Sequence, residues 1–426
     1  MKLRRTLLSS LLSKNHHPHP LLQQWRSITK VRLKWVKNRG LDHIIDRESD
    51  LKAACLLKDA IKHSPTQFLN ANTFSEWQKH LGLTIPVLRF IRRYPTLFHE
   101  FPNSRYPSLP CFRLTDTALQ LDSLEQTLHQ SNESDTVDRL CRLIMMTNSK
   151  MLPFKSLHPL KWDLGLPHNL ITSIVPKYPD RLKVVRGDNG VQCLSIGEWR
   201  DEIGVSELQR RHERDELKDG YREFKRARAA SALAFPMSFP RGYGAQKKVK
   251  AWMDEFHKLP YISPYEDSSG IDPESDLMEK RVVGVLHEIL SLTIHKKTKR
   301  NYLRALREEL NLPHRFTRVF TRYPGIFYLS LKCKTTTVAL REGYQRGKVV
   351  NPHPLVNIRE KYYYVMKTGL LYRGKGVDLT SDKNCVLDDD GGDAVDEHSD
   401  EGVETDDEYC EDDVSSDVGE ESDEEE

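Results

Sequence analysis

Three stretches of the chain share one pattern of apolar and polar positions. In each, an apolar-faced helix leads to Leu-(Gly/Asn)-Leu, then to a proline and a second short apolar helix that stops at Tyr-Pro. A proline at a helix start costs little because the N–H it lacks would have no partner there, and the proline after Tyr ends the helix. The sequence therefore predicts one helix-turn-helix three times, with upstream helices over 51–62, 136–146 and 277–293 and Tyr-Pro phrases over 80–95, 163–179 and 309–324.

Two runs of alternating apolar residues follow each Tyr-Pro. This alternation around turn-forming residues predicts a β-hairpin, most clearly at Asp188, Asn189 and Gly190. Helix, helix-turn-helix and hairpin is the order of a winged helix, a comparison used here for architecture alone. We predict a mostly α protein with short β-hairpins (α+β), built from three divergent winged-helix-like units. The Tyr-Pro tyrosines are 84 and 145 residues apart, so the array is irregular.

These units and their flanking segments divide the chain into six predicted regions. Residues 199–234 are strongly charged with helical spacing, and a Pro-aromatic loop around one short helix follows them. The regions are an organelle presequence (1–29), the first unit (30–130), the second unit (131–198), a charged helical connector with the Pro-aromatic loop (199–274), the third unit (275–375) and an acidic tail (376–426). The composition of the tail predicts disorder.

Charge is distributed unevenly along the chain. The net charge of +3 combines 65 Lys and Arg with 62 Asp and Glu, but 22 of the acidic residues lie in 388–426, beyond the last basic residue, Lys383. The preceding body therefore carries 40 acids against all 65 bases, a net charge of +25. A body this positive attracts a polyanion or an acidic surface. The acidic tail either shields that body until a partner competes it away or only aids solubility.

The N-terminus has the composition of a targeting segment. Residues 1–41 contain no Asp or Glu, while early arginines, serines and a leucine-faced helical pattern are present. This combination is typical of an organelle presequence, with a disordered basic tail as the alternative, and it favours the mitochondrion over the chloroplast. No apolar run approaches the about 18 residues that a membrane-spanning helix requires, so we expect no membrane partner.

Basic residues recur on the helix that ends at Tyr-Pro, at two positions four residues apart. These positions hold Arg89 and Arg93, Ser173 and Lys177, and Arg318 and Arg322. Four-residue spacing places both side chains on one helix face, where two guanidiniums suit successive phosphates or an unpaired base. The alternative is a solvated helix face. The tyrosines of Tyr-Pro are interpreted as buried helix-end anchors rather than as stacking platforms.

Two further clusters combine basic residues with possible nucleic-acid contacts. Trp35 stands among Lys30, Arg32, Lys34, Lys37 and Arg39. Interleaved aromatic and basic residues suit single-stranded nucleic acid, although a strand that packs Val31, Leu33 and Trp35 inward fits equally well. A fourth basic cluster, at a predicted helix start, consists of Lys296, Lys297, Lys299 and Arg300.

The sequence contains none of the catalytic motifs that we sought. It has no P-loop, no nucleophile elbow, no His-Glu-x-x-His and no dinucleotide-binding glycine motif. The seven cysteines are scattered and never form Cys-x-x-Cys, which argues against a disulfide framework and a zinc site. We therefore expect no catalytic residue, metal or cofactor, and a thiol hydrolase is supported only by composition.

Several long phrases resemble the plant organelle RNA recognition domain family over about residues 27–375. Among them are FIRRYPTLFHEF, FPMSFPRGYG, WMDEFHKLPYISPYED and LNLPHRFTRVFTRYPGIFYLSLK. The shorter Leu-Gly-Leu-Pro and Tyr-Pro phrase is also similar to the repeats of mitochondrial transcription termination factors. The main resemblance implies non-catalytic RNA binding that promotes group II intron splicing, in which the intron supplies its own chemistry. It assigns no RNA-contacting residue, so the candidates above rest on spacing.

We therefore expect a protein that is imported into mitochondria, binds organellar intron RNA and has other splicing factors as further partners. No small-molecule substrate is expected. The first alternative is an organellar DNA-binding transcription or termination factor, which would prefer duplex DNA to RNA. The second is a thiol hydrolase, whose activity would be lost when one Cys or His is changed.

Overall fold

The computed structural model describes most of the body of the chain. The described residues are 28, 31, 33, 35–103, 105–187, 190–218, 233–239, 246–331 and 336–372. They lie within the unit Met1–Ser381. The predicted acidic tail and all but one residue of the predicted presequence fall outside them. The described part is mostly helical with short antiparallel strands, which confirms the predicted α+β class.

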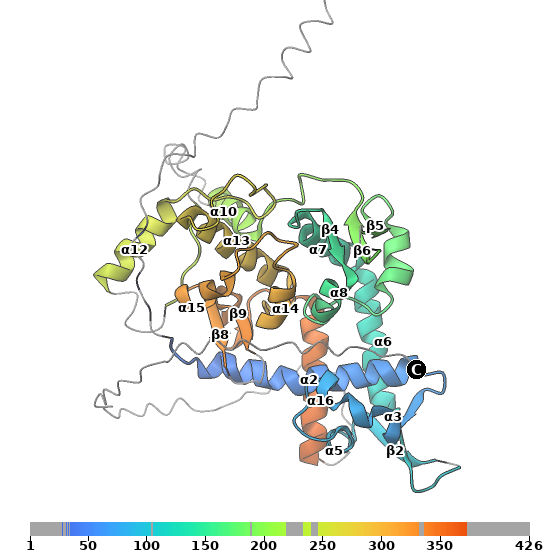
Figure 1. Cartoon of the computed structure of the whole chain (residues 1–426). Helices are drawn as coiled ribbons and strands as arrows, with labels where there is room; N and C mark the ends of the chain where they lie inside the picture. Colours follow the sequence, from blue (N-terminus) through green and yellow to red (C-terminus); the bar gives the residue numbers. More distant parts are fainter. Residues whose placement is uncertain are drawn as a thin grey trace, which may run out of the picture. The chain divides into compact units, whose positions relative to one another are not determined.

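Three units of similar order follow one another along the chain, each from a long helix through a short strand and short helical segments to a β-hairpin (Figure 1). The first unit comprises α2 (Arg39–His63), β1 (Phe68–Asn70), α3 (Ala71–Phe74), η1 (Ser75–Trp77), α4 (Gln78–Leu81), α5 (Val87–Ile91), β2 (Phe98–Pro102) and β3 (Pro110–Leu114). The second comprises α7 (Glu133–Met145), β4 (Met151–Pro153), α8 (Phe154–Leu157), η2 (His158–Leu160), η3 (Leu170–Ile174), α9 (Val175–Lys177), β5 (Leu182–Arg186) and β6 (Gln192–Ile196). The third comprises α13 (Asp276–Leu292), β7 (Lys297–Lys299), α14 (Arg300–Ala305), η4 (Phe316–Arg318), α15 (Val319–Arg322), β8 (Phe327–Ser330) and β9 (Thr337–Leu340).

Each unit contains one three-stranded antiparallel sheet, in the orders β1-β3-β2, β4-β6-β5 and β7-β9-β8. The hairpins lie where alternating apolar residues predicted them. The first strand of each sheet pairs with the last strand of the hairpin, as in the opposition of Leu152 and Leu194. These first strands are three residues long, too short to produce a visible alternation, and the sequence analysis missed them. The winged-helix comparison stays an analogy.

The residue in the middle of each Leu-(Gly/Asn)-Leu phrase adopts a left-handed backbone conformation. The φ angles of Gly82, Gly165 and Asn311 are +71°, +62° and +50°. In each case the following leucine donates its backbone N–H to a carbonyl five residues earlier, at N···O distances of 3.0, 2.9 and 2.9 Å. Such a closure satisfies the last carbonyls of the preceding helix. Gly and Asn occur there because they adopt this conformation at the lowest cost.

The apolar core forms two clusters. One cluster belongs to the first unit and includes Tyr362 and Val365 of α16 (Pro354–Tyr372). The other is shared by the second and third units and includes Phe235, Trp252 and Phe256 from the predicted connector. That segment, which contains α10 (Glu207–Lys218) and α12 (Lys247–Lys258), therefore packs as part of the body. The predicted domain boundaries themselves stay a prediction.

Three helices or helix segments that the sequence analysis did not identify connect the units. They are the N-terminal half of α2, α6 (Asp116–Ser131) and α16, which follows η5 (Arg341–Gly343), β10 (Tyr344–Gln345) and β11 (Lys348–Val349). Near its start, α2 contacts the third unit, because Asp42 accepts hydrogen bonds from Tyr328 (2.8 Å) and Ser330 (2.6 Å). Helix α16 returns to the first unit, where it packs against α6 and α2 (Figure 1).

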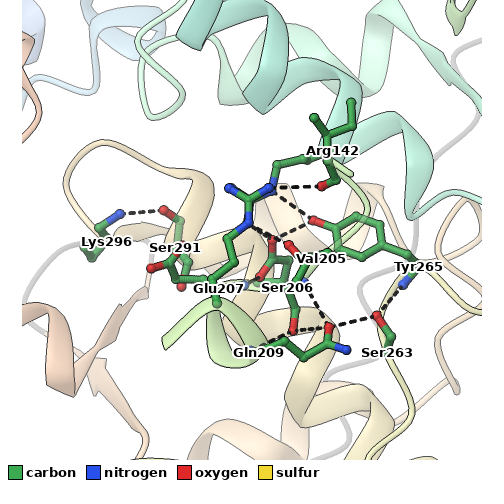
Figure 2. Close-up of polar contacts among 12 residues, drawn as sticks. Arg142, Val205, Ser206, Glu207, Gln209, Ser263, Tyr265, Ser291 and Lys296 are labelled. Atoms are coloured by element: carbon green, nitrogen blue, oxygen red, sulfur yellow. Dashed lines mark hydrogen bonds and ion pairs between the residues drawn. The ribbon is translucent and has the colours of Figure 1, made fainter. Parts of the chain in front are cut away.

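A buried polar network joins α7, the segment before α13, and α13 itself. Figure 2 shows Arg142 directed toward the Tyr265 hydroxyl. One Glu288 oxygen, Oε1, accepts from Arg142 Nη2 at 2.5 Å and from the Tyr265 hydroxyl at 2.6 Å, while Oε2 accepts from the Glu207 backbone N–H at 2.8 Å. The Glu288 side chain is 0% exposed. Because burial raises the pKa of Tyr265 well above its usual value, the phenol remains a donor.

Candidate nucleic-acid interface

The helix before Tyr94 presents two of the predicted arginines to solvent. Val87, Phe90 and Ile91 are buried on its core side, as expected from the sequence, and Arg89 and Arg93 are exposed. Helix α5 ends at Ile91, so Arg93 lies in the turn that leads to Tyr94. Neither arginine has an ion pair within the described part of the chain. Both cations are therefore available to an anionic ligand.

Arg92, between them, behaves differently. Its Nε and Nη2 donate to the two carboxylate oxygens of Glu100 at 2.9 and 2.6 Å. The side chain is 51% exposed, so this is a surface ion pair. Arg92 thus has the same charge and almost the same position as Arg93, but its charge is compensated.

In the third unit, the two arginines of the predicted pair have different environments. Arg318 is exposed, but Arg322 is half-buried and its guanidinium binds Glu279 of α13. Although burial opposes the charge of Arg322, the hydrogen bond and ion pair with Glu279 raise its pKa. The other Glu279 oxygen accepts from the Tyr323 hydroxyl at 2.7 Å. Arg322 therefore connects its helix to α13, and its predicted contact with RNA stays a prediction.

In the second unit, Lys177 is exposed and its Nζ lies 3.0 Å from Glu133 Oε1 of α7. The base before Tyr-Pro therefore pairs with the preceding long helix in both the second and third units. Tyr94 follows a related pattern, because its hydroxyl donates to Asp50 of α2 at 3.0 Å. Tyr94 and Tyr323 are buried anchors, as interpreted from the sequence, while Tyr178 is half-buried.

The segment around Trp35 packs against the third unit. Trp35 is half-buried, its indole N–H donates to the Leu329 carbonyl at 2.9 Å, and its ring stacks on Tyr328 with centroids 6.3 Å apart. Leu33 is buried in the core. These contacts fit the packing alternative, although residues 35–38 form no strand. Of the surrounding bases, Lys37 and Arg39 are exposed, and Lys30, Arg32 and Lys34 lie outside the described residues.

The fourth basic cluster leads into α14 and is partly internal. Lys297 is 6% exposed and its ammonium pairs with Glu48 of α2, and its predicted contact with RNA stays a prediction. Lys296 is half-buried and donates to the Ser291 carbonyl (Figure 2), and burial lowers its pKa. Lys299 and Arg300 are half-buried. Lys299 Nζ lies 5.8 Å from the centroid of the Tyr302 ring.

A cleft with a volume of about 1310 Å³ adjoins Arg93. Residues of α2, of the turn after α4, of β7 and of α16 line it. Its basic residues are Arg47, Lys52, Lys79, Arg93, Lys297, Lys299 and Lys367, and its acidic residues are Asp46, Glu48, Asp50, Glu76 and Asp163. Lys79 and Lys367 could not be predicted from the sequence, because each belongs to no local basic pattern and only folding brings them to the same cleft.

The described cysteines give no support to a thiol hydrolase. Cys55, Cys111, Cys141 and Cys193 are buried thiols, and burial raises the pKa of Cys55 and Cys141. A thiol kept protonated in this way is a poor nucleophile. Within the described ranges no group of His, Cys, Asp and Glu side chains could hold a metal ion, and no helix combines the length and apolarity needed to cross a membrane.

Comparison with known proteins places this architecture in a family. The model of the plant organelle RNA recognition domain matches residues 36–371. The Arabidopsis thaliana protein WHAT'S THIS FACTOR 9, mitochondrial, is 34% identical over 82% of this chain and 89% of its own length. The chloroplastic WHAT'S THIS FACTOR 1 of Zea mays is 31% identical over 78% of this chain and 67% of its own.

A third relative is ROOT PRIMORDIUM DEFECTIVE 1 of Arabidopsis thaliana, which is 27% identical over 76% of this chain and 81% of its own length. No solved structure matches the chain. The matched region includes all three units and helix α16.

Proposed function

Because the chain belongs to the plant organelle RNA recognition domain family, we propose that it binds intron RNA and promotes group II intron splicing. Recognition of organellar RNA is the function that defines the family. The protein is mitochondrial, as its N-terminal pattern predicted and as the mitochondrial relative with 34% identity supports. In this role the protein stabilises the folded intron without catalysing the reaction, and other splicing factors are its further partners.

The observation that carries the proposal is the set of exposed arginines on, or directly after, helical segments whose other face is buried. Arg89, Arg93 and Arg318 reach solvent, whereas Phe90 and Phe320 fix their helices in the core. Cations held in this way neutralise phosphates without a large cost in ordering the backbone. A folded intron brings phosphates close together, so neutralising them stabilises the folded RNA.

The test measures binding of the full-length chain to a group II intron RNA, to an unstructured RNA and to duplex DNA. We expect the triple variant Arg89→Ala, Arg93→Ala and Arg318→Ala to bind the intron more weakly. We also expect the slope of log K against log salt to become shallower by about 1 for each phosphate that the variant no longer neutralises. The measurement is a filter-binding titration at several salt concentrations.

Arg92→Ala is the matched control, because it removes the same charge from the same turn but from an existing ion pair with Glu100. Its affinity and salt slope should stay close to those of the natural chain. Tighter binding to duplex DNA than to RNA would favour the transcription-factor alternative. An unchanged affinity of the triple variant would remove these arginines from the interface.

A further inference from the structure

We propose that the cleft beside Arg93 binds a single-stranded segment of RNA. This inference rests on the proposed function and assigns it a second contact surface, which shares Arg93 with the first. The cleft volume of about 1310 Å³ exceeds the roughly 300–1,000 Å³ that is usual for a small-molecule site. Its size suits a segment of a polymer.

The acidic residues deep in the cleft are already bound by the protein itself. Glu48, with its side chain 13% exposed, pairs with Lys297 and accepts from the Trp162 indole at 3.3 Å. Asp163 accepts from the Thr298 hydroxyl at 2.5 Å. Asp50 accepts from the Tyr94 hydroxyl, as described above. Of these carboxylates, Glu48 is paired with Lys297, and Asp163 lies 4.0 Å from Lys52 Nζ, whereas the hydroxyl that binds Asp50 leaves its charge in place. The seven basic and five acidic lining residues together give the cleft a formal charge of 7 − 5 = +2.

Four of the basic lining residues have no such compensation. Within the described part of the chain, none of them forms an ion pair; they are the exposed Lys79 and Arg93 and the half-buried Lys299 and Lys367. They come from α4, the turn after α5, β7 and α16. Cations that four different elements contribute to one cleft suit a phosphate backbone that runs through it.

Aromatic rings accompany these cations. Tyr363 lines the cleft, and the Arg47 guanidinium lies 4.8 Å from its ring centroid. Tyr302 is not a lining residue, but the ammonium groups of two lining lysines, Lys52 and Lys299, lie 5.5 and 5.8 Å from its ring centroid. Half-buried rings next to cations provide surfaces for unpaired bases. Bases in a duplex are stacked on one another and cannot use them, which favours a single strand.

The central test is the double variant Lys79→Ala and Lys367→Ala in the full-length chain. Its matched control, Lys250→Ala and Lys348→Ala, removes two positive charges from exposed positions outside the cleft. The probe is oligouridine of about 12 nucleotides, within the range of single-strand site sizes. We expect the cleft variant to bind about tenfold more weakly, or about 1.4 kcal/mol. Its slope of log K against log salt should become shallower by about 1.4, the value for two single-strand phosphate contacts.

A second variant has the opposite expected sign. Glu76 is exposed and lines the cleft, so its carboxylate repels a phosphate backbone. Glu76→Gln should therefore strengthen oligouridine binding by about twofold to threefold, an effect below 1 kcal/mol. Since a gain in affinity cannot arise from misfolding, this variant guards against a trivial explanation of the lysine result.

Photochemical cross-linking with oligouridine that contains 4-thiouridine independently identifies the protein segments that contact the RNA. Cross-links on peptides that contain Tyr363 or Lys367 would support the cleft. If the natural chain binds RNA but the cleft variant matches the control, the cleft inference is wrong and the proposed function stands. If the natural chain binds no RNA at any salt concentration, both are wrong.

Discussion

At the scale of the residue, equivalent positions in the three units have different structural environments. Arg93, Lys177 and Arg322 all precede the tyrosine of Tyr-Pro, but Lys177 and Arg322 are bound to Glu133 and Glu279. Sequence spacing predicted their shared register correctly. It could not predict the partners, because each acid lies more than forty residues away in the chain and meets the base only after the helices pack.

The most buried ion pair gives a prediction for stability. Glu288→Ala leaves the Arg142 guanidinium, whose side chain is 10% exposed, without its buried counterion. We expect the free energy of unfolding to decrease by about 3–5 kcal/mol, because an unpaired buried charge is costly. Urea denaturation followed by circular dichroism measures this change.

Glu100→Ala is the control for that experiment, because it breaks an ion pair at the surface, with side chains 51% and 38% exposed. Its effect on the free energy of unfolding should stay below about 1 kcal/mol. Equal effects of the two substitutions would show that burial of Glu288 does not determine its contribution.

At the scale of the element, short-range signals were the most informative. The Leu-(Gly/Asn)-Leu phrase predicted three tight turns, and the structure contains all three with positive φ. Proline and alternating apolar residues placed the helix ends and the hairpins. The first strands of the sheets were missed because they are defined by hydrogen-bonding partners about forty residues away.

Glycine substitutions separate backbone strain from packing in these turns. An added Cβ at Gly82 would meet no atom within 4 Å. Gly82→Ala should therefore lower the free energy of unfolding only by the penalty for alanine in the left-handed conformation, about 1–2 kcal/mol. At Gly165 the Cβ would lie 3.0 Å from Leu355 Cδ1 and 3.1 Å from Ile294 Cγ2. Gly165→Ala should therefore cost more. Chemical denaturation of both variants measures the difference.

Gly270→Ala is the reference substitution, because Gly270 has neither a positive φ nor a neighbour within 4 Å of the added Cβ. We expect its unfolding free energy to stay within about 0.5 kcal/mol of the natural value. If Gly82→Ala and Gly270→Ala had the same effect, the assigned role of the left-handed turn would be incorrect.

At the scale of the whole molecule, the sequence predicted the charge of the body but not how the units pack together. The excess positive charge of the body follows from counting residues, because residues 1–387 carry a formal net charge of +25. The packing of the units against one another could not be predicted from the sequence. Helix α16 completes the core of the first unit, and the predicted connector fills the core shared by the other two.

The charge difference predicts how the acidic tail influences binding to polyanions. Removing residues 388–426 changes the formal net charge from +3 to +25. We expect the shortened chain to bind heparin and unstructured RNA more tightly at low salt, by about tenfold or more, with the difference fading as salt screens the charges. Titrations of both ligands across a salt series measure the effect.

A chain that carries a neutral Gly/Ser segment of equal length in place of residues 388–426 separates charge from length. It should behave like the shortened chain if charge is responsible. Unchanged polyanion binding in both variants would restrict the tail to the solubility role.

The sequence by itself determined the α+β class, the three repeated units, their turns and hairpins, the basic body and the family. These properties depend on residues close together in the chain or on simple counts, so they can be recognised before folding. Only the tertiary structure decided that Arg322 and Lys297 are internal partners, that Arg93 is available, and that Lys79 and Lys367 share a cleft. Burial and pairing depend on which distant side chains meet, and packing of whole helices determines that.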